Sequence, residues 1–395
     1  MNGISMYPDL IVLGSTGSVG EQAMDVARAH AIPVRGVTAH ASVAAVEAQI
    51  REFHPDFAVM TDETAATDLR TRVADTNTRV LSGFGGITEM LHTVKTENPL
   101  GITAENSILG EAGLLPTLET LKAGHKLALA NKESLVVGGE LVMALAREKE
   151  TTILPVDSEH CAIFQCLRAG RQEEINRILL TASGGPFYGY TKEQLEGVTK
   201  AMTLNHPTWK MGAKITVDSA TLMNKGFEVI EAVHLFGVEP EKVEVIVHRE
   251  SMLHSMVEYI DHSIIAQMSV PDMRHCVQYA LTHPRRLPAE GTLKQADLFA
   301  LGKLTFGRPD TEVFPLLALA RDCITRGGAL PCVLNAANEI IVAAFLGDAI
   351  RFCQIPELVT RVVEELSYTA AWHSYDELME ADALARETAN RFLNL

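Results

Sequence analysis

The first 156 residues alternate short apolar runs with helical patterns, and this alternation constrains the fold more than any other feature. The apolar runs include residues 10–13, 34–38, 57–60, 126–130 and 153–156, and helical patterns follow at 18–30, 42–53, 111–123 and 134–149. Strands that alternate with helices are typical of a parallel sheet with helices packed on it. The sequence therefore predicts an α/β fold that begins with a doubly wound, Rossmann-like domain.

The pattern changes after residue 156. Polar loops mix with strands, notably at 242–247 and in a hairpin that turns at 261–263, which indicates an α+β region. The end of the chain is helical at 315–326, 331–346, 356–368 and 375–393. We predict a Rossmann-like domain at 1–156, an α+β domain at 157–285, a linker at 286–312 and a C-terminal helical bundle at 313–395.

Composition narrows the class of protein. Of the 395 residues, 47% are hydrophobic and 21% are charged, as in an ordinary globular enzyme. The net charge of −16 argues against nucleic-acid and membrane partners, but not against a small anionic substrate. The chain has no apolar run that could cross a bilayer and no recognisable targeting segment, so we expect a cytoplasmic location. Its six cysteines lack a CxxC pair, and we expect buried free thiols.

A glycine-rich loop, Gly14-Ser-Thr-Gly-Ser-Val-Gly20, joins the first strand to the first helix. Such a loop is either a plain structural turn or a dinucleotide site, and its position in a βαβ unit favours the second interpretation. The helix N-terminus then offers N–H groups to the phosphates of a cofactor. The candidate cofactor-binding residues in this loop are Thr16, Gly17, Ser18 and Val19.

The end of the second strand bears on cofactor choice. NAD enzymes usually carry an acidic residue there for the ribose 2′-hydroxyl, whereas this chain has Thr38-Ala39-His40-Ala41-Ser42. The missing acid favours NADPH over NADH. His40, Ala41 and Ser42 are the predicted neighbours of its 2′-phosphate.

Residues 155–228 hold a concentration of polar side chains. Asp157 and Glu159 follow the strand at 153–156, and Glu228 supplies a third candidate carboxylate. Hard oxygen ligands without a His or Cys cluster favour Mg²⁺ or Mn²⁺. The alternative is that Asp157-Ser158-Glu159 caps a helix, which would leave Glu228 unexplained. Donors suited to a phosphate lie in the same region, namely Ser183, His206, Ser219, Asn224 and Lys225.

Ten ordered motifs together resemble the 1-deoxy-D-xylulose-5-phosphate reductoisomerase family over nearly the whole chain. They lie at residues 14–20, 112–117, 130–134, 155–160, 183–187, 206–212, 217–228, 254–259, 271–274 and 333–339. One departure is His40-Ala41-Ser42, where the family often has a basic residue and an Asn.

The resemblance implies the site residues and their roles. It makes Asp157, Glu159 and Glu228 metal ligands for Mn²⁺ or Mg²⁺ and gives Lys132 and Ser158 to the sugar phosphate substrate. It puts Asn131, Glu133 and Gly212 near the nicotinamide cofactor. Lys132 and the three metal ligands are the predicted catalytic residues. The predicted substrate contacts are Lys132, Ser158, Glu159, Ser183, His206, Ser219, Asn224, Lys225 and Glu228.

The resemblance also implies a flap at 206–212, in which Trp209 covers the substrate; a Trp in a rigid core is the alternative. It further implies a homodimer that makes 2-C-methyl-D-erythritol 4-phosphate with NADPH in isoprenoid precursor biosynthesis. Two other functions are considered: an NADP dehydrogenase without isomerase activity, and a non-catalytic nucleotide sensor. All three predicted metal carboxylates are present, which argues against the sensor, and the polar region after residue 156 argues against the simple dehydrogenase.

Overall fold

The computed structural model describes residues 8–98, 101–209, 211–289, 293–367, 372 and 374–393. The chain divides into two compact units. The first comprises Met1–Asn131, Val142–Cys161 and Asp272–Lys294, and the second comprises Lys132–Leu141, Ala162–Pro271 and Gln295–Leu395. Two of the boundaries fall within helices, one in α6 (Glu133–Glu148) and one in α7 (Ser158–Cys166).

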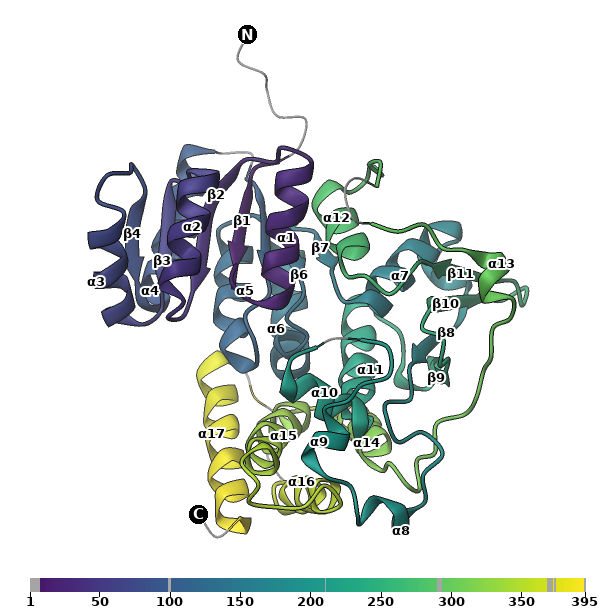
Figure 1. The fold of residues 1–395 in the computed structure, drawn as a ribbon. Helices are drawn as coiled ribbons and strands as arrows, with labels where there is room; N and C mark the ends of the chain where they lie inside the picture. Colours follow the sequence, from purple (N-terminus) through teal and green to yellow (C-terminus); the bar gives the residue numbers. More distant parts are fainter. Residues whose placement is uncertain are drawn as a thin grey trace. The chain divides into compact units, whose positions relative to one another are not determined.

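The first unit is built on a parallel seven-stranded sheet with the strand order β4-β3-β2-β1-β5-β6-β7 (Figure 1). The strands are β1 (Leu10–Leu13), β2 (Val34–Ala39), β3 (Phe57–Met60), β4 (Arg79–Ser82), β5 (Thr103–Asn106), β6 (Lys126–Leu129) and β7 (Ile153–Pro155). The order reverses between β1 and β5, and open α/β sheets bind ligands at the carboxyl ends of the strands beside such a point. The predicted α/β class is confirmed.

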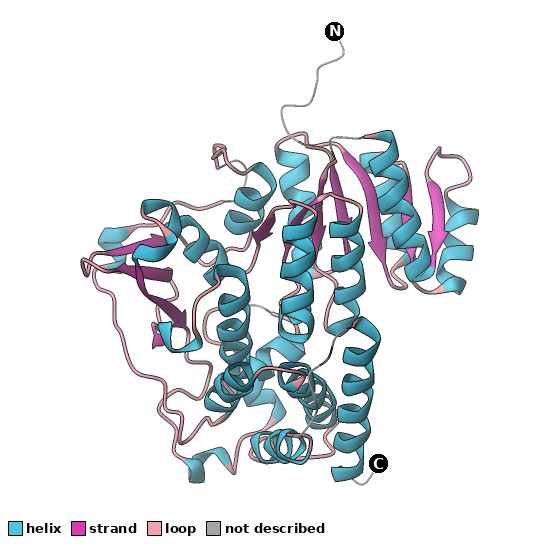
Figure 2. Cartoon of the chain, turned by 180° about the vertical axis from the view of Figure 1, so that it is seen from behind, coloured by secondary structure: helices cyan, strands magenta, loops and turns pink. Residues whose placement is uncertain are grey.

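Helices pack on this sheet (Figure 2). They are α1 (Ser18–Ala29), α2 (Val43–Phe53), α3 (Glu63–Arg72), α4 (Gly83–Glu97), α5 (Leu114–Lys122) and α12 (Arg274–Thr282). Ile87 and Met90 of α4 pack against Ile11 and Leu13 of β1 in one buried cluster. The helices predicted at 18–30, 42–53, 111–123 and 134–149 are all present within one or two residues at most boundaries.

Two strands of the sheet were not predicted, because neither is a short apolar run in the sequence. β4 lies at the edge of the sheet and none of its residues is fully buried, so it needs no apolar run. β5 is buried throughout but reads Thr-Ala-Glu-Asn, which is a polar sequence for a central strand. Its side chains Glu105 and Asn106 are both fully buried.

The second unit contains a four-stranded sheet with the order β11-β10-β8-β9. The strands are β8 (Ile175–Ala182), β9 (Val243–Val247), β10 (Leu253–Tyr259) and β11 (Ile264–Met268). β10 and β11 pair antiparallel, with Glu258 opposite Ile264, so the hairpin predicted at 261–263 is confirmed.

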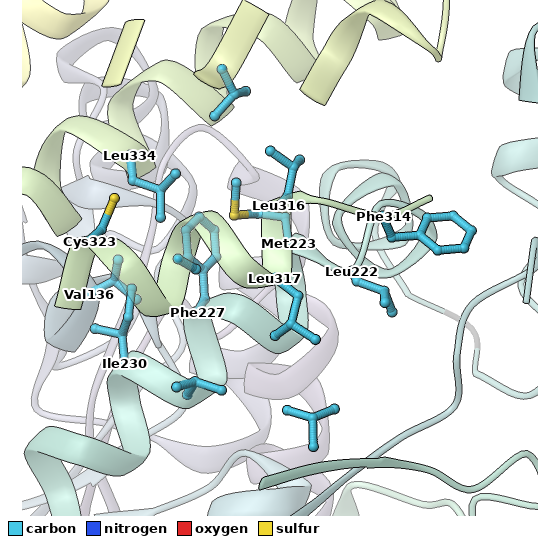
Figure 3. Close-up of a cluster of buried hydrophobic side chains, with 14 of the residues drawn as sticks. Val136, Leu222, Met223, Phe227, Ile230, Phe314, Leu316, Leu317, Cys323 and Leu334 are labelled. Atoms are coloured by element: carbon cyan, nitrogen blue, oxygen red, sulfur yellow. The ribbon is translucent and has the colours of Figure 1, made fainter. Parts of the chain in front are cut away.

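The same unit holds most of the chain's later helices. They are α8 (Lys192–Leu195), α9 (Lys200–Thr203), α10 (Ala213–Ala220), α11 (Met223–Phe236), α13 (Leu298–Leu301), α14 (Leu316–Arg326), α15 (Leu330–Leu346), α16 (Gln354–Glu365) and α17 (Tyr375–Phe392). Figure 3 shows Phe227 and Ile230 of α11 beside Leu316 and Leu317 of the α14 start in the buried core. This confirms the predicted helical C-terminal region.

Three further expectations concern the chain as a whole. All six cysteines lie within the described residues as thiols outside any disulfide; five are buried and Cys353 is half-buried, in agreement with the prediction. Within the described ranges, no helix has both the length and the apolar character needed to span a membrane. The division into a linker at 286–312 and three domains stays a prediction.

Candidate active site

The glycine loop of the first unit is shaped for close approach of backbone. Gly14 has φ +91°, a conformation that favours glycine. A Cβ on Gly20 would lie 2.2 Å from the Gly14 carbonyl oxygen, so only glycine fits where α1 crosses the loop. Gly17 caps α1 without a side-chain hydrogen bond. A glycine N-cap has no side chain to accept from the N–H groups of the first turn, which leaves these groups able to donate to an anion.

The end of β2 lies beside this loop. The Gly14 N–H donates to Thr38 Oγ1 at 2.9 Å, and the Ser15 hydroxyl donates to Gln49 Oε1 at 2.7 Å. His40, Ala41 and Ser42 are exposed, and His40 Nδ1 lies 2.8 Å from Thr61 Oγ1. Sequence reasoning missed Thr38 and Gln49 because their contacts join residues 24 and 34 positions apart.

An acidic residue does approach the end of β2, from the next strand. The Asp62 N–H donates to the His40 carbonyl at 3.2 Å. The Asp62 carboxylate, however, accepts the Ala65 N–H at 2.7 Å and caps α3. The Oδ1 atom of Asp62 therefore serves the N-terminus of α3.

Asn131 holds the loop after β5. Its side-chain amide donates to the carbonyls of Ile108 at 2.7 Å and Gly110 at 2.9 Å. The side chain is buried, and a Cβ on Gly113 would lie 2.5 Å from its amide. In the first unit, Asn131 is therefore a residue that fixes loop geometry at the carboxyl ends of β5 and β6.

The first unit also presents the pair of carboxylates after β7. Asp157 accepts the Glu159 N–H at 3.1 Å, and its Oδ1 lies 3.1 Å from His160 Nδ1. The Ser158 hydroxyl donates to Glu159 Oε2 at 2.6 Å. Asp157 thus caps the start of α7, so the capping alternative holds. Capping uses one of its oxygens and leaves the carboxylate compatible with a ligand role.

His160 is the residue near this pair that sequence reasoning missed. It is fully buried, and its position three residues after Asp157 was the only available signal. A ring nitrogen that contacts a carboxylate fixes the orientation of that carboxylate.

In the second unit, Glu228 is enclosed by donors. Lys132 Nζ donates to Asn224 Oδ1 at 2.9 Å and to Glu228 Oε1 at 3.1 Å. The Asn224 amide donates to Glu228 Oε1 at 2.5 Å, and Lys225 forms an ion pair with Glu228 Oε2. The i, i+1 and i+4 positions on α11 bring the three side chains together. Glu228 is 1% exposed, and its two carboxylate oxygens contact the ammonium groups of Lys132 and Lys225.

Three of the predicted phosphate-binding side chains lie together in a separate cluster of the second unit. His206 Nε2 lies 3.1 Å from Ser183 Oγ and 3.2 Å from Ser219 Oγ. His206 Nδ1 accepts the N–H groups of Thr208 at 3.2 Å and Trp209 at 3.0 Å. Since Nδ1 accepts, the hydrogen of the neutral ring is on Nε2. We call Ser183, His206 and Ser219 the serine–histidine cluster.

The histidine of this cluster is neutral near pH 7. Burial, and then the positive charge of Arg249, lowers the pKa of His206 to about 4. A Cβ on Gly185, which has φ +67°, would lie 2.6 Å from the Ser219 carbonyl oxygen, so the turn that carries Ser183 packs directly on α10. Arg249 was not among the predicted residues.

The predicted flap follows this cluster. Trp209 is half-buried, and its ring centroid lies 6.2 Å from that of His254. Lys210 lies outside the described residues. Gly212 precedes α10 and caps it without a side-chain hydrogen bond.

Glu133 takes part in a network that the sequence did not indicate. Lys214 Nζ lies 3.0 Å from Glu133 Oε1 and 2.9 Å from Asp218 Oδ2. The Asn338 amide donates to Asp218 Oδ1 at 2.8 Å. Although burial opposes it, attraction to Asp218 and Glu133 raises the pKa of Lys214. The network ties the start of α6 and the C-terminal helix α15 to α10, which carries Ser219.

The chain is similar to known proteins over most of its length. A family model described as 1-deoxy-D-xylulose 5-phosphate reductoisomerase matches residues 10–139. Models described as C-terminal domains of the same reductoisomerase match residues 153–236 and 268–388.

Whole proteins show the same similarity. A relative in Caldanaerobacter subterraneus subsp. tengcongensis, named 1-deoxy-D-xylulose 5-phosphate reductoisomerase, is 46% identical over 384 residues, 97% of this chain and 98% of the relative. The Zymomonas mobilis reductoisomerase in complex with NADPH has a TM-score of 0.90 at 39% identity, covering 98% of this chain and 99% of the other. A DOX-P reductoisomerase in complex with NADPH, fosmidomycin and magnesium has a TM-score of 0.91 at 35% identity, covering 98% of both chains.

Proposed function

The chain belongs to the 1-deoxy-D-xylulose 5-phosphate reductoisomerase family, and we propose that it is an NADPH- and divalent-metal-dependent oxidoreductase of that activity. The proposed reaction isomerises and reduces 1-deoxy-D-xylulose 5-phosphate to 2-C-methyl-D-erythritol 4-phosphate for isoprenoid precursor biosynthesis. The observation that carries the proposal is the full-length match to relatives of this name, with every predicted carboxylate and phosphate donor present in the chain.

We propose Asp157, Glu159 and Glu228 as ligands of Mg²⁺ or Mn²⁺. The donor chemistry fits, because all three offer hard carboxylate oxygens. Glu228 forms ion pairs with Lys132 and Lys225 in the second unit, so a metal ion bound there would share this carboxylate with the two ammonium groups. When bound, the metal polarises substrate oxygens and NADPH supplies the hydride.

The chain's own residues orient the substrate in this proposal. Lys132, held by Asn224 and Glu228, presents its ammonium to substrate oxygens together with the hydroxyl of Ser158. The serine–histidine cluster, with Asn224 and Lys225, binds the phosphate. The flap at 206–212 excludes water, with Trp209 over the substrate. We retain the catalytic domain at 157–285 and the C-terminal bundle at 313–395 as part of this proposal.

The cofactor proposal rests on the glycine loop and its neighbours. Thr16, Gly17, Ser18 and Val19 lie at the start of α1, where backbone N–H groups favour a pyrophosphate. The exposed His40, Ala41 and Ser42 carry no acid that would repel a 2′-phosphate. Asn131, Glu133 and Gly212 are proposed near the nicotinamide.

We also infer a cytoplasmic homodimer. Six cysteines that form no disulfide among the described residues agree with a reducing compartment. β11 is an edge strand, and Ile264 and Ile265 are 50% and 38% exposed. An exposed apolar edge strand favours pairing with a second chain.

The test is NADPH oxidation by purified protein with 1-deoxy-D-xylulose 5-phosphate and Mg²⁺ or Mn²⁺, followed by product analysis. A branched product supports the proposal, whereas a reduced linear product would favour a dehydrogenase without isomerase activity. No oxidation would favour a nucleotide sensor.

The metal assignment has its own variant. Glu228→Gln keeps the shape of the side chain but removes a charged ligand, so turnover should fall by about 100-fold or more. The exposed Glu196→Gln serves as the control. Wild-type turnover of Glu228→Gln at limiting metal would contradict the ligand role.

A further inference from the structure

The serine–histidine cluster offers hydrogen bonds to a phosphate but little positive charge. Its members are two hydroxyls and an imidazole whose pKa lies at about 4, so all three are neutral at pH 7. Lys132 and Lys225 of the predicted set both form ion pairs with Glu228. The three side chains of the cluster themselves contribute no charge to balance a phosphate dianion.

Arg249 lies directly behind the cluster. One of its terminal nitrogens, Nη1, donates to the carbonyls of Ser183 at 3.1 Å and Gly185 at 2.6 Å. Its guanidinium carbon lies 5.5 Å from the centroid of the Tyr188 ring. These contacts fix both the guanidinium and the turn that carries the Ser183 hydroxyl.

The charge of Arg249 has no carboxylate partner among the residues that the structure describes. The neighbouring Glu250 contacts His248 Nδ1 at 2.9 Å and accepts the Thr305 hydroxyl at 2.6 Å. Its carboxylate therefore has partners other than Arg249. Within the described part of the chain, the acceptors of the Arg249 guanidinium are the carbonyl oxygens of Ser183 and Gly185. A half-buried guanidinium without a counter-ion attracts an anion.

The same charge acts on the cluster, because it contributes to the lowered pKa of His206. The Arg249 charge thus helps to keep His206 in the neutral form, in which Nε2 donates a hydrogen bond. A phosphate oxygen accepts such a bond.

We propose that Arg249 is a positioning residue of the phosphate subsite. It holds the Ser183–Gly185 turn, and its positive charge balances part of the negative charge of the bound phosphate. The inference rests on the proposed function for the identity of the substrate, but not for the binding of a phosphate group. A phosphate bound at Ser183, His206 and Ser219 would then be compensated without a direct contact to the guanidinium.

The test compares Arg249→Gln and Arg249→Lys with wild-type enzyme. Loss of the charge should raise KM for the sugar phosphate and Kd for inorganic phosphate by about tenfold, with kcat within about twofold. Arg249→Lys keeps the charge and should recover most of the affinity. The wild-type Kd should rise with ionic strength more steeply than that of Arg249→Gln, since a compensating charge is screened by salt.

Arg321 provides a matched control. It also donates to two carbonyls, those of Pro240 at 2.5 Å and Val243 at 2.6 Å. Val243 begins β9 and Val247 ends it beside Ala182, so this clamp is roughly 13 Å away from the cluster along the strand. Arg321→Gln should lower stability as Arg249→Gln does, and leave phosphate affinity unchanged.

Three results would overturn the inference. One is equal affinity for phosphate in wild type and Arg249→Gln. Another is an Arg249→Lys variant that binds phosphate as weakly as Arg249→Gln but keeps the salt dependence of wild type. That result would show that Arg249 only holds the turn in place. The third is an equal loss in Arg321→Gln. Arg249→Met replaces Arg249→Gln if the latter does not fold. Because inorganic phosphate is the probe, the result stands apart from whether the enzyme turns over the sugar phosphate.

Discussion

Glu105 gives a prediction that can be worked from its surroundings. It lies in the central strand β5, is 0% exposed, and its Oε1 has no partner among the described residues. Its Oε2 lies 3.1 Å from Ser107 Oγ, which also lies 3.2 Å from the Leu13 carbonyl. The serine hydroxyl has one hydrogen and the carbonyl has none. Both contacts are hydrogen bonds only when Glu105 is protonated and donates to Ser107.

The cost of holding this carboxyl neutral follows from its pKa. Burial raises the pKa of Glu105 from 4.5 to about 8, against the opposing effect of the Ser107 hydroxyl. Between these values the folded protein is protonated and the unfolded chain is ionised. Glu105 therefore lowers the free energy of unfolding by nothing below pH 4.5, and by an increasing amount as the pH rises from 4.5 towards 8. At about 1.4 kcal/mol per pH unit, the loss at pH 7 is about 3 kcal/mol.

Glu105→Gln removes this cost, because its amide is neutral in both states and still donates to Ser107. The free energy of unfolding at pH 7 should rise by about 3 kcal/mol, with a larger gain at pH 8 and none near pH 4.5. Urea unfolding followed by circular dichroism, with hydrogen exchange of the β5 amides, measures the change, and the exposed Glu63→Gln is the control. A pH profile of stability parallel to that of wild type would refute the reasoning.

Two further predictions concern the two units separately. Gly20→Ala should weaken NADPH binding by about tenfold in a fluorescence titration, because the new Cβ meets the Gly14 carbonyl at 2.2 Å; Gly17→Ala, whose Cβ would lie 3.4 Å from the same oxygen, should cost less, and equal affinities for all three proteins would contradict the packing argument. Lys214→Met should lower the free energy of unfolding by about 3 kcal/mol, because Asp218 is 1% exposed and would keep a buried charge without its cation; restored stability in the Lys214→Met, Asp218→Asn double variant checks the cause, and a stable single variant would exclude it.

The sequence predicted the parts of the fold that local patterns determine. The strand–Gly14 loop–helix unit, the helices of the C-terminal region and the hairpin after Tyr259 are each set by residues close together in the chain, through periodicity, glycine and turn chemistry. β5 was missed because its burial comes from its position between β1 and β6, which overrides a polar sequence. Glu105 is a residue that no local pattern would assign to a core.

The candidate site divides along the same line. Residue type alone suggested Lys225 as a donor and Glu228 as a carboxylate ligand, and the structure places the two side chains together because residues three positions apart on a helix face one another. What spacing does not give is which charges remain after neighbours pair. Lys225 forms an ion pair with Glu228, whereas Arg249, 66 residues from Ser183, has no carboxylate partner among the residues that the structure describes. The affinity of a phosphate subsite depends on the positive charges that are not paired with carboxylates. A lysine or arginine found in the sequence therefore has to be considered together with any carboxylate that the fold places beside it.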